Sequence, residues 1–319
     1  MSKWEYTKGL HHLGGGLYAY LLPDGSWGWS NAGLLVDGED SLLIDTLFDL
    51  DLTREMLLAM AAAEDAARTI KKVVITHGNG DHFYGIELLK GAEIICTEAC
   101  AEEMTRTPPQ MLAQLKAAAP GMGDLGAFFL QCFSPFMFEG INPIPPTRTF
   151  ERRLDINVGS KDVHLIQVGP AHTEGDMLVY VPENRVLFAG DILFIGGTPI
   201  MWAGPASNWI KACDMILEMD LDAIVPGHGP ITDKTGVAAV KGYWEYLYAE
   251  ARNRFDAGMS VEEAISDIDM SRYSSWSDGE RIVVNLQTLY REFKGDTTAH
   301  NPVELFGGMA KLGLKTKVT

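Results

Sequence analysis

The sequence predicts an α/β fold in which short apolar strands alternate with helices, followed by a helical C-terminal part. Short β-branched runs between polar flanks, such as Lys72 to Thr76, are typical of buried strands. Longer segments rich in alanine, leucine and charged residues, such as Asp49 to Arg68, have the propensity and spacing of helices. Strands interleaved with helices predict layers of helices packed on sheets.

The N-terminal part reads as β structure with turns. His11 and His12 precede the first predicted strand, and we expect them to be surface or loop residues rather than ligands. Asp37 to Asp40 is a predicted turn. The strands expected up to the middle of the chain are Leu17 to Leu22, Ala32 to Val36, Ser41 to Ile44, Lys72 to Thr76 and Glu93 to Cys96, with helices at Asp49 to Arg68 and Phe83 to Lys90.

The segment from Thr97 to Thr147 has a different composition, because methionines and phenylalanines are interrupted by prolines. It is too apolar for a solvated linker, so we expect an apolar helical insert at about residues 105–147. One interpretation gives this insert its own small core. The other makes it a lid over the active site, since Met and Phe side chains form adaptable apolar walls.

The second half returns to strands and then becomes helical. His164 alternates with apolar neighbours, which places it on the solvent face of its strand.

We expect residues 1–240 to form the main domain and residues 241–319 a helical extension that caps the sandwich, lines the substrate pocket or forms a homo-oligomer contact. The predicted strands are Phe150 to Val168, Met177 to Val181, Val186 to Ala189 and Ala223 to Val225, and the predicted helices are Ser207 to Met219, Asp233 to Phe255, Ser260 to Ile268 and Gly279 to Phe293.

Composition and charge narrow the class of protein. The 319 residues are 46% hydrophobic and 22% charged, as expected for one large α/β domain with additions. The net charge of -17 would repel a phosphate backbone, so we expect no nucleic-acid partner. No apolar run is long enough to span a membrane, and the start lacks the layout of a secretory signal, so we expect a cytoplasmic protein. The cysteines lack metal-binding spacing and are expected to be free structural thiols, namely Cys96, Cys100, Cys132 and Cys213.

A cluster of potential metal ligands follows the strand that ends near Thr76. His77, Asp81 and His82 are interleaved with glycines, which accept backbone angles that other residues avoid, so the loop can fold back and point several side chains at one spot. Imidazole nitrogens and carboxylate oxygens are typical ligands of zinc. Further His and Asp residues stand near glycines and strand ends at His172, Asp191 and His228. Core packing does not explain this joint pattern, which predicts a metal site. We expect Asp45, at a strand end, to hold the loop as a partner of a ligand.

These stations resemble those of the metallo-β-lactamase fold superfamily. The segment Thr76 to His82 is similar to its His-x-His-x-Asp-His signature, except that Asn79 stands where the second His is usual. Four other stations follow the family's order, namely Leu42 to Thr46, Gly169 to Asp176, Phe188 to Asp191 and Val225 to Pro230. The resemblance covers about residues 10–235 and implies a four-layer αββα sandwich with the ligands at one edge.

The resemblance also implies how the ligands divide. His77 and His172 would bind a first metal, and Asp191 would bridge it to a second metal. The second metal would be bound by Asp81, His82 and His228. We expect one or two Zn²⁺ ions per chain, with iron or manganese as alternatives. Asn79 offers a weaker ligand than imidazole, which leaves three outcomes: an asymmetric pair with one loosely held metal, a single-metal enzyme, or a degraded site.

The expected function is that of a metal-dependent hydrolase. A metal-bound hydroxide would attack an ester, thioester, lactone or amide carbonyl, and Asp81 would also orient the water. The apolar insert and the run Phe194 to Trp202 favour a small aromatic or acyl substrate. Two alternatives stay open: an iron-dependent oxidoreductase on the same scaffold, and a noncatalytic ligand-binding protein with a degraded metal site, which only Asn79 suggests.

Overall fold

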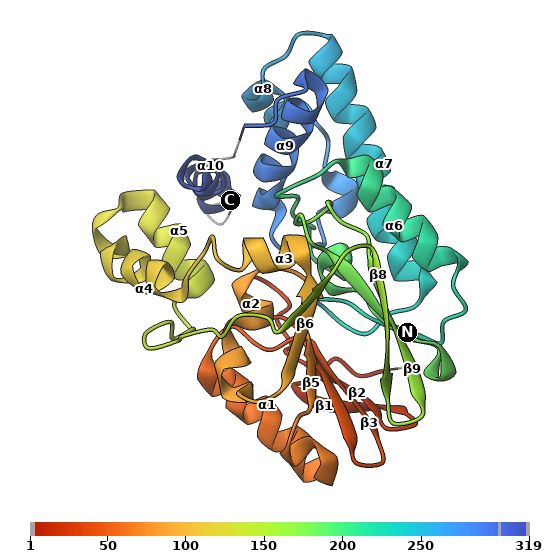
Figure 1. Ribbon diagram of the computed structural model, residues 1–319. Coiled ribbons are helices and arrows are strands. Elements are labelled where there is room, and N and C mark those ends of the chain that lie inside the picture. Colours follow the sequence, from red (N-terminus) through yellow and green to blue (C-terminus); the bar gives the residue numbers. More distant parts are fainter. Residues whose placement is uncertain (1–3, 299–300, 317–319) are drawn as a thin grey trace.

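Two β-sheets form the centre of the molecule in the computed structural model, which describes residues 4–298 and 301–316. Met1 to Lys3, at the start that lacks the layout of a secretory signal, lie outside the described residues. The last three residues of the predicted helical extension also lie outside them. The first sheet has seven strands in sequence order, and the second has five strands in the order β12-β11-β10-β9-β8. Figure 1 shows both sheets with the helices around them.

The first sheet is antiparallel from β1 to β4 and parallel from β4 to β7. Its strands are β1 Gly9–Gly14, β2 Leu17–Leu21, β3 Ala32–Asp37, β4 Asp40–Ile44, β5 Lys72–Val74, β6 Glu93–Thr97 and β7 Arg148–Phe150. The second sheet is antiparallel except for the parallel pair of β11 and β12. Its strands are β8 Arg153–Val158, β9 Lys161–Gln167, β10 Met177–Val181, β11 Val186–Phe188 and β12 Ala223–Val225.

Neighbouring residues of the central strands are buried on opposite faces of their sheets. In β4, Leu42 and Ile44 belong to the core between the two sheets, whereas Leu43 belongs to the core under the helices. In β11, Phe188 faces the inner core and Leu187 the outer one. Side chains alternate along a strand, so a run that is apolar at every position requires cover on both faces. The continuous apolar runs therefore specify buried sheets with helices outside.

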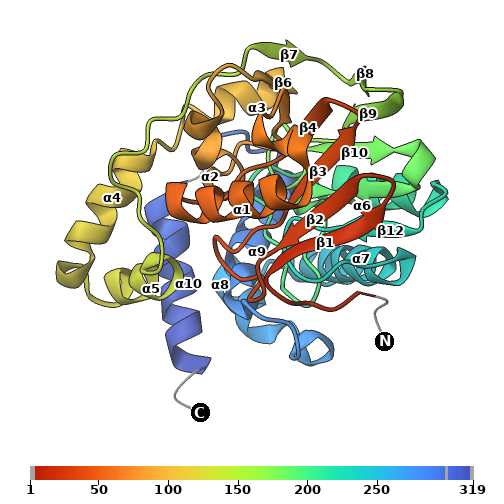
Figure 2. The same cartoon turned by 90° about the horizontal axis from the view of Figure 1, so that it is seen from below.

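Helices cover the outer faces of the two sheets and complete the four-layer αββα sandwich. The helix α1 (Leu50–Ala63) packs through Met56 and Met60 into the outer core of the first sheet. The second sheet is covered by α6 (Ala206–Glu218) and α7 (Lys234–Asp256). In Figure 2, α1 lies against the first strands, and α6 and α7 lie beside β12. The predicted fold class is thereby confirmed.

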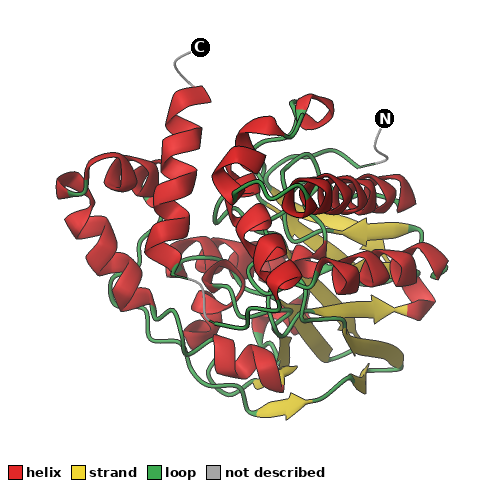
Figure 3. Ribbon diagram, turned by 90° about the horizontal axis from the view of Figure 1, so that it is seen from above, coloured by secondary structure: helices red, strands yellow, loops and turns green. Residues whose placement is uncertain are grey.

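The insert and the C-terminal extension are both helical. The insert contains α4 (Pro109–Ala118) and α5 (Gly123–Phe133), and the extension contains α8 (Val261–Asp267), α9 (Ile282–Lys294) and α10 (Pro302–Thr316). The helix α10 packs against both α5 and α9. Figure 3 shows that these helices gather on one side of the strands. No described helix combines the length and apolarity needed to cross a membrane.

The insert does not have a core of its own. The ring of Phe136 lies 4.9 Å from that of Phe48, just before α1, and Phe133 lies 5.8 Å from Phe48. Phe138 also lies 4.9 Å from Phe48, so three insert rings share one aromatic partner of the main domain. All belong to the main hydrophobic core. The interpretation of a separate small core is therefore wrong.

The predicted secondary structure was wrong at two places where tertiary contacts outweigh the local sequence pattern. His11 and His12, which precede the first predicted strand, belong to β1, an edge strand that was not predicted and that pairs with β2. The helix expected from Phe83 to Lys90 is instead one α-turn, α2 (Gly80–Phe83), followed by the 3₁₀ segment Tyr84–Leu89. A β-carbon at Gly85 would lie 2.2 Å from Thr53 Oγ1, so this segment packs very closely on α1.

Candidate metal centre

Three of the predicted ligands lie on the loop and short helix that follow β5. The backbone of Thr76 is tied to both sheets, because its carbonyl accepts from Met177 N at 3.0 Å and its N–H donates to Asp45 Oδ1 at 2.7 Å. His77 follows directly, and Asp81 and His82 lie in α2. The loop that carries these ligands therefore begins at a residue that is hydrogen-bonded to segments of both sheets.

The loop glycines serve a different purpose from the one expected. Neither Gly78 nor Gly80 has a positive φ. A β-carbon at Gly78 would lie 2.5 Å from Glu103 Cβ, and one at Gly80 would lie 2.5 Å from the ring of Tyr84. These positions therefore require glycine for close packing rather than for unusual backbone angles.

The other three predicted ligands follow strands of the second sheet. His172 lies on the connection between β9 and β10, Asp191 in the 3₁₀ turn Gly190–Ile192 after β11, and His228 after β12. A β-carbon at Gly227 would lie only 1.9 Å from Asp191 Oδ1. Glycine before His228 therefore leaves room for the carboxylate at the centre of the site.

The structure brings all six predicted ligands together around Asp191. Its Oδ2 lies 3.3 Å from His172 Nε2, 3.5 Å from His228 Nε2 and 3.6 Å from His77 Nε2. Its Oδ1 lies 3.2 Å from His82 Nε2. On the far side of the cluster, Asp81 Oδ2 lies 3.2 Å from His228 Nε2 and 3.8 Å from His82 Nε2.

Three imidazoles are oriented by a hydrogen bond on the ring nitrogen that faces away from Asp191. His77 Nδ1 bonds Thr76 Oγ1 at 3.1 Å, His82 Nδ1 bonds Asp45 Oδ2 at 2.9 Å, and His172 Nδ1 bonds Ile200 O at 2.6 Å. In each neutral ring the Nε2 lone pair then points into the cluster, as metal ligands require.

Asp45 organises this arrangement from behind. It accepts hydrogen bonds from Thr76 N, Thr76 Oγ1 and His82 Nδ1, and it adopts the left-handed backbone conformation with φ 61°. Its role as the partner that holds the loop agrees with the sequence prediction. Burial raises its pKa, although these hydrogen bonds oppose the shift.

The fourth imidazole is held by stacking. His228 lies parallel to Phe194, with 5.1 Å between ring centroids and an angle of 2° between planes. The guanidinium of Arg281 lies over Phe194 at 5.2 Å and over Trp27 at 4.5 Å. Sequence analysis named Phe194 only as part of an apolar run and missed Trp27 and Arg281, because Arg281 comes from the C-terminal extension and no local motif marks it.

The donor set fits a divalent metal. His77 Nε2, His82 Nε2 and Asp191 Oδ1 are buried and have no hydrogen-bond partner of good geometry among the described residues. Two groups have their donor atoms within 4.8 Å of one another: His77, His82 and Asp191, and Asp81, His82 and His228. A tetrahedral zinc with bonds of about 2.0 to 2.2 Å separates its ligands by about 3.3 to 3.6 Å. The distances around Asp191 Oδ2 fall in this range.

The charges of the site also favour a cation. Burial opposes ionisation of Asp191, but the surrounding imidazoles, with His228 and His82 foremost, hold its pKa well below the ordinary value. Burial would lower the pKa of His228, but Asp191 and Asp81 raise it to about 9. For His77, burial and the neighbouring His82 keep the pKa well below its ordinary value. Asp191 is therefore ionised and His77 is neutral, whereas His228 carries a proton at neutral pH that a bound metal would displace.

Asn79, which replaces the family's usual histidine, faces His172. Its Nδ2 donates to His172 Nε2 at 3.0 Å, the same lone pair that would bind a metal. Coordination through the amide oxygen would require the amide to turn over. Asn79 thus competes with a metal for His172 in this arrangement.

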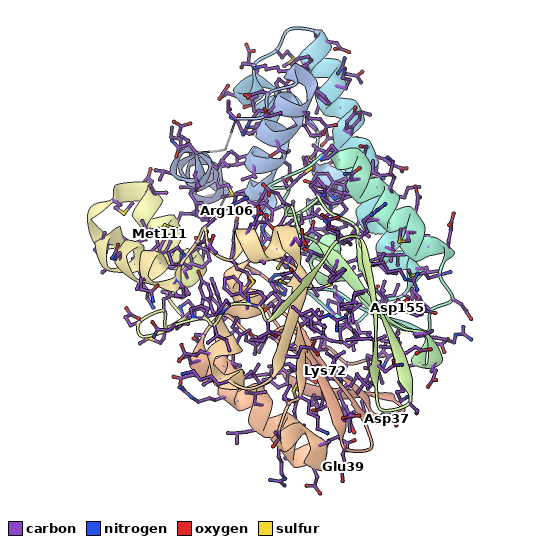
Figure 4. All side chains as sticks on the ribbon, in the orientation of Figure 1. Asp37, Glu39, Lys72, Arg106, Met111 and Asp155 are labelled. Atoms are coloured by element: carbon purple, nitrogen blue, oxygen red, sulfur yellow. The ribbon has the colours of Figure 1, made fainter. Side chains whose placement is uncertain are left out.

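A cavity of about 360 Å³ opens onto the cluster, within the size range of small-molecule sites. Asn79, Asp81, His172, Asp191 and His228 border it, and its remaining wall is mainly apolar. The insert contributes much of this wall, including Met111 on α4, which is labelled in Figure 4 together with Arg106. The expectation of an insert that covers the site agrees with this placement.

Comparison with known proteins gives the family. Residues 25–228 match the model of the Metallo-beta-lactamase superfamily. The 2,4-dinitroanisole O-demethylase subunit alpha of Nocardioides sp. (strain JS1661) is 29% identical over 37% of this chain and 37% of its own length. The acyl-coenzyme A thioesterase MBLAC2 of Homo sapiens is 24% identical over 62% of this chain and 72% of its own.

A solved structure shares the fold across nearly the whole chain. The sec-alkylsulfatase Pisa1 from Pseudomonas sp. has a TM-score of 0.68 and 17% identity, over 93% of this chain and 52% of that protein. The chain thus spans about half of the sulfatase and little more than a third of the demethylase subunit. With a family model matching well over half its residues, the chain belongs to the metallo-β-lactamase superfamily.

Proposed function

We propose that this chain is a metal-dependent hydrolase that cleaves an ester, thioester, lactone or amide bond of a small substrate with an apolar acyl or aromatic group. The observation that carries the proposal is the cavity, which is bordered by four of the six clustered metal donors and by a mainly apolar wall. The human relative named as an acyl-coenzyme A thioesterase supports hydrolysis at an acyl carbonyl.

In this proposal His77 and His172 hold one zinc ion, Asp81, His82 and His228 hold a second, and Asp191 is shared. Zinc suits nitrogen and carboxylate donors, and when bound it would activate water and polarise the substrate carbonyl. Asp45, Thr76 and the Ile200 carbonyl keep three of the imidazoles in the ligating tautomer.

Asp81 also faces the substrate. Its carboxylate borders the cavity and lies 3.2 Å from His228 Nε2. It can therefore orient an attacking water as well as hold a metal. The apolar wall beside it lowers the local polarity, which strengthens electrostatic interactions inside the cavity.

The test is turnover of a panel of esters, thioesters, lactones and amides by protein of measured metal content. Asp81→Ala and Asp191→Ala should each reduce turnover to background while circular dichroism shows a folded chain. His164→Ala is the control, because that ring hydrogen-bonds the exposed Asp155 on the second sheet, so its loss should leave rates unchanged. Wild-type rates in either aspartate variant, or zinc-loaded protein inactive on the whole panel, would refute the proposal.

A further inference from the structure

The C-terminal helix α10 forms part of the wall of the cavity. Pro302, Val303 and Phe306 border it together with the insert, although α10 lies well outside the family-matched residues 25–228. Figure 1 shows α10 between the insert helices and the other C-terminal helices, and Figure 2 shows the same neighbours from below. A segment that the family match does not cover thus borders the same space as the metal donors.

Phe306 is the residue of α10 at which three other segments meet. Its ring lies 5.6 Å from Trp27, 6.1 Å from Phe133, 6.2 Å from Phe128 and 6.3 Å from Trp202. These partners come from the loop after β2, from α5 and from the loop after Asp191. Phe306 itself is only partly buried and borders the cavity. Its size therefore affects the space that a ligand can occupy.

The packing of α10 makes this wall firm. Leu305, Met309 and Ala310 of the same helix are almost fully buried. A β-carbon at Gly308 would lie 2.7 Å from Val283 Cγ1, so α10 approaches α9 closely at this position. Because glycine permits that approach, Phe306 is held in place by the fold and not by its own contacts alone.

The chemistry of the cavity points to an uncharged tail on the ligand. We define the acyl pocket as the part lined by Leu115, Met122, Leu125, Phe129, Val303 and Phe306, none of which carries a charge. Methionine and leucine side chains adapt to a flexible chain. Apart from the aspartates of the metal centre, the charged groups described in the cavity wall have protein partners.

Those charged groups are Glu103, Arg106 and Arg281. Glu103 accepts from Glu174 N and Gly175 N at 2.8 and 3.1 Å, and Arg106 makes a two-pronged pair with the Glu174 carboxylate. Arg281 donates to Thr198 O at 2.9 Å and lies 3.4 Å from Asp278. Each of these three charged groups therefore already interacts with another part of the protein.

We propose that the acyl pocket binds the unbranched acyl chain of an ester or thioester, and that Phe306 of α10 sets the length of chain accepted. The substrate carbonyl would lie at the metal centre, with the chain extending along the insert helices toward α10. This inference rests on the proposed hydrolase function for its substrate, but the pocket can be tested by binding alone.

Hydrolysis of p-nitrophenyl butyrate, octanoate and dodecanoate by the zinc-loaded protein measures chain selectivity. Phe306→Ala should shift the preferred substrate to a longer chain, raising the dodecanoate-to-butyrate ratio of kcat/KM by about tenfold or more, since each buried methylene contributes about fourfold. Phe306→Trp should shift it to a shorter chain. p-Nitrophenyl benzoate is included, and a preference of the wild type for benzoate over every acyl ester would overturn the assignment of an acyl chain.

Phe255→Ala is the matched control. Phe255 is also a partly buried phenylalanine of the C-terminal helices, but it packs on Tyr290 and Phe293 away from the cavity. Phe255→Ala should destabilise the fold by about as much as Phe306→Ala and should leave the chain-length selectivity unchanged. Equal selectivity in Phe306→Ala, Phe306→Trp and Phe255→Ala would overturn the inference.

Binding separates the failure of the inference from that of the hydrolase function. Dodecanoate should quench the fluorescence of the wild type, because Trp27 and Trp202 border the cavity. Its affinity should fall in Phe306→Trp and change little in Phe255→Ala. If these binding results are obtained but no ester is turned over, they would support the assignment of the acyl pocket and refute the hydrolase function. Equal dodecanoate affinity in wild type and Phe306→Trp would overturn the pocket, whatever the turnover.

Discussion

At the scale of single residues, the metal centre depends on side chains that bind no metal themselves. Asp45 is buried behind His82, accepts three hydrogen bonds and adopts a left-handed backbone conformation that asparagine also tolerates. Its replacement by asparagine therefore changes the hydrogen bonding with little backbone strain. This makes Asp45 a sensitive test of how the ligand loop is held.

We expect Asp45→Asn to weaken zinc binding by about 10- to 100-fold, because the amide nitrogen cannot accept a hydrogen bond from Thr76 or His82. Competition with a chromogenic chelator measures this loss. Asp155→Asn is the control, since it alters a similar aspartate–histidine pair on the surface, where Asp155 bonds His164 at 2.8 Å. Unchanged zinc affinity in Asp45→Asn would show that the loop holds His82 without this carboxylate.

Asn79 is the second residue whose role can be isolated. We expect the wild type to hold between one and two metals per chain and to lose the first to mild chelation, because Asn79 donates to the His172 lone pair and offers no imidazole. Asn79→His should raise occupancy and chelator resistance at the first site. Its activity can still fall, since the added ligand would fill a position that substrate needs.

Metal titration of both proteins decides the role of Asn79. Tight binding of two metals by wild type and variant alike would show that the asparagine is no deficit. In that case another residue completes the first site.

At the scale of elements, the buried carboxylate of Asp49 forms hydrogen bonds with both α1 and the insert. Asp49 caps α1 by accepting from Leu52 N at 2.8 Å, and it also accepts from Met137 N at 3.1 Å in the segment that leaves α5. One side chain thus begins a helix of the main domain and fixes the end of the insert.

Asp49→Ala should lower the free energy of unfolding by about 1 to 3 kcal/mol, because it removes a helix cap and leaves the Met137 N–H without its partner. Urea denaturation of the metal-loaded protein measures the change. Asp51→Ala is the control, since Asp51 is exposed and forms a surface ion pair with Arg54, so its loss should cost less than about 0.5 kcal/mol. Equal effects of the two changes would contradict the link to the insert.

At the scale of the whole molecule, the metal centre joins the two sheets. His77, Asp81 and His82 follow β5 of the first sheet, whereas His172, Asp191 and His228 follow strands of the second. A bound metal is therefore a cross-link between the halves of the sandwich. Ligands that bind only the folded state stabilise it by mass action.

Chelation should lower the midpoint of thermal unfolding of the whole chain by several degrees, because a metal present at about 100 times its Kd contributes about 2.7 kcal/mol. Calorimetry with and without a chelator measures this shift. Asp191→Ala, which lacks the central ligand, should show almost no further shift. Identical midpoints for metal-loaded and metal-free wild type would mean that no tightly bound metal links the sheets.

The sequence by itself predicted helices layered on buried sheets and the residues that could bind a metal, and its resemblance to the metallo-β-lactamase fold superfamily added the αββα sandwich and the division of the ligands. Continuous apolar runs require cover on both faces of a sheet, and ligands placed just after strand ends converge when those ends meet at one edge. Asp45 could be placed behind the loop for the same reason, because it also follows a buried strand. Each of these features is marked by a short local pattern, although the patterns themselves lie far apart in the chain.

Only the tertiary structure decided how the site is enclosed. Phe194 stacks on His228, Arg281 covers Phe194, and Phe306 of α10 meets Trp27 across most of the chain length. The glycines of the ligand loop likewise proved to be required by neighbours in space, such as Glu103 at Gly78, and not by their own backbone angles. Contacts between distant segments leave no periodicity or spacing in the sequence, because each residue's local pattern is set by its own helix or strand.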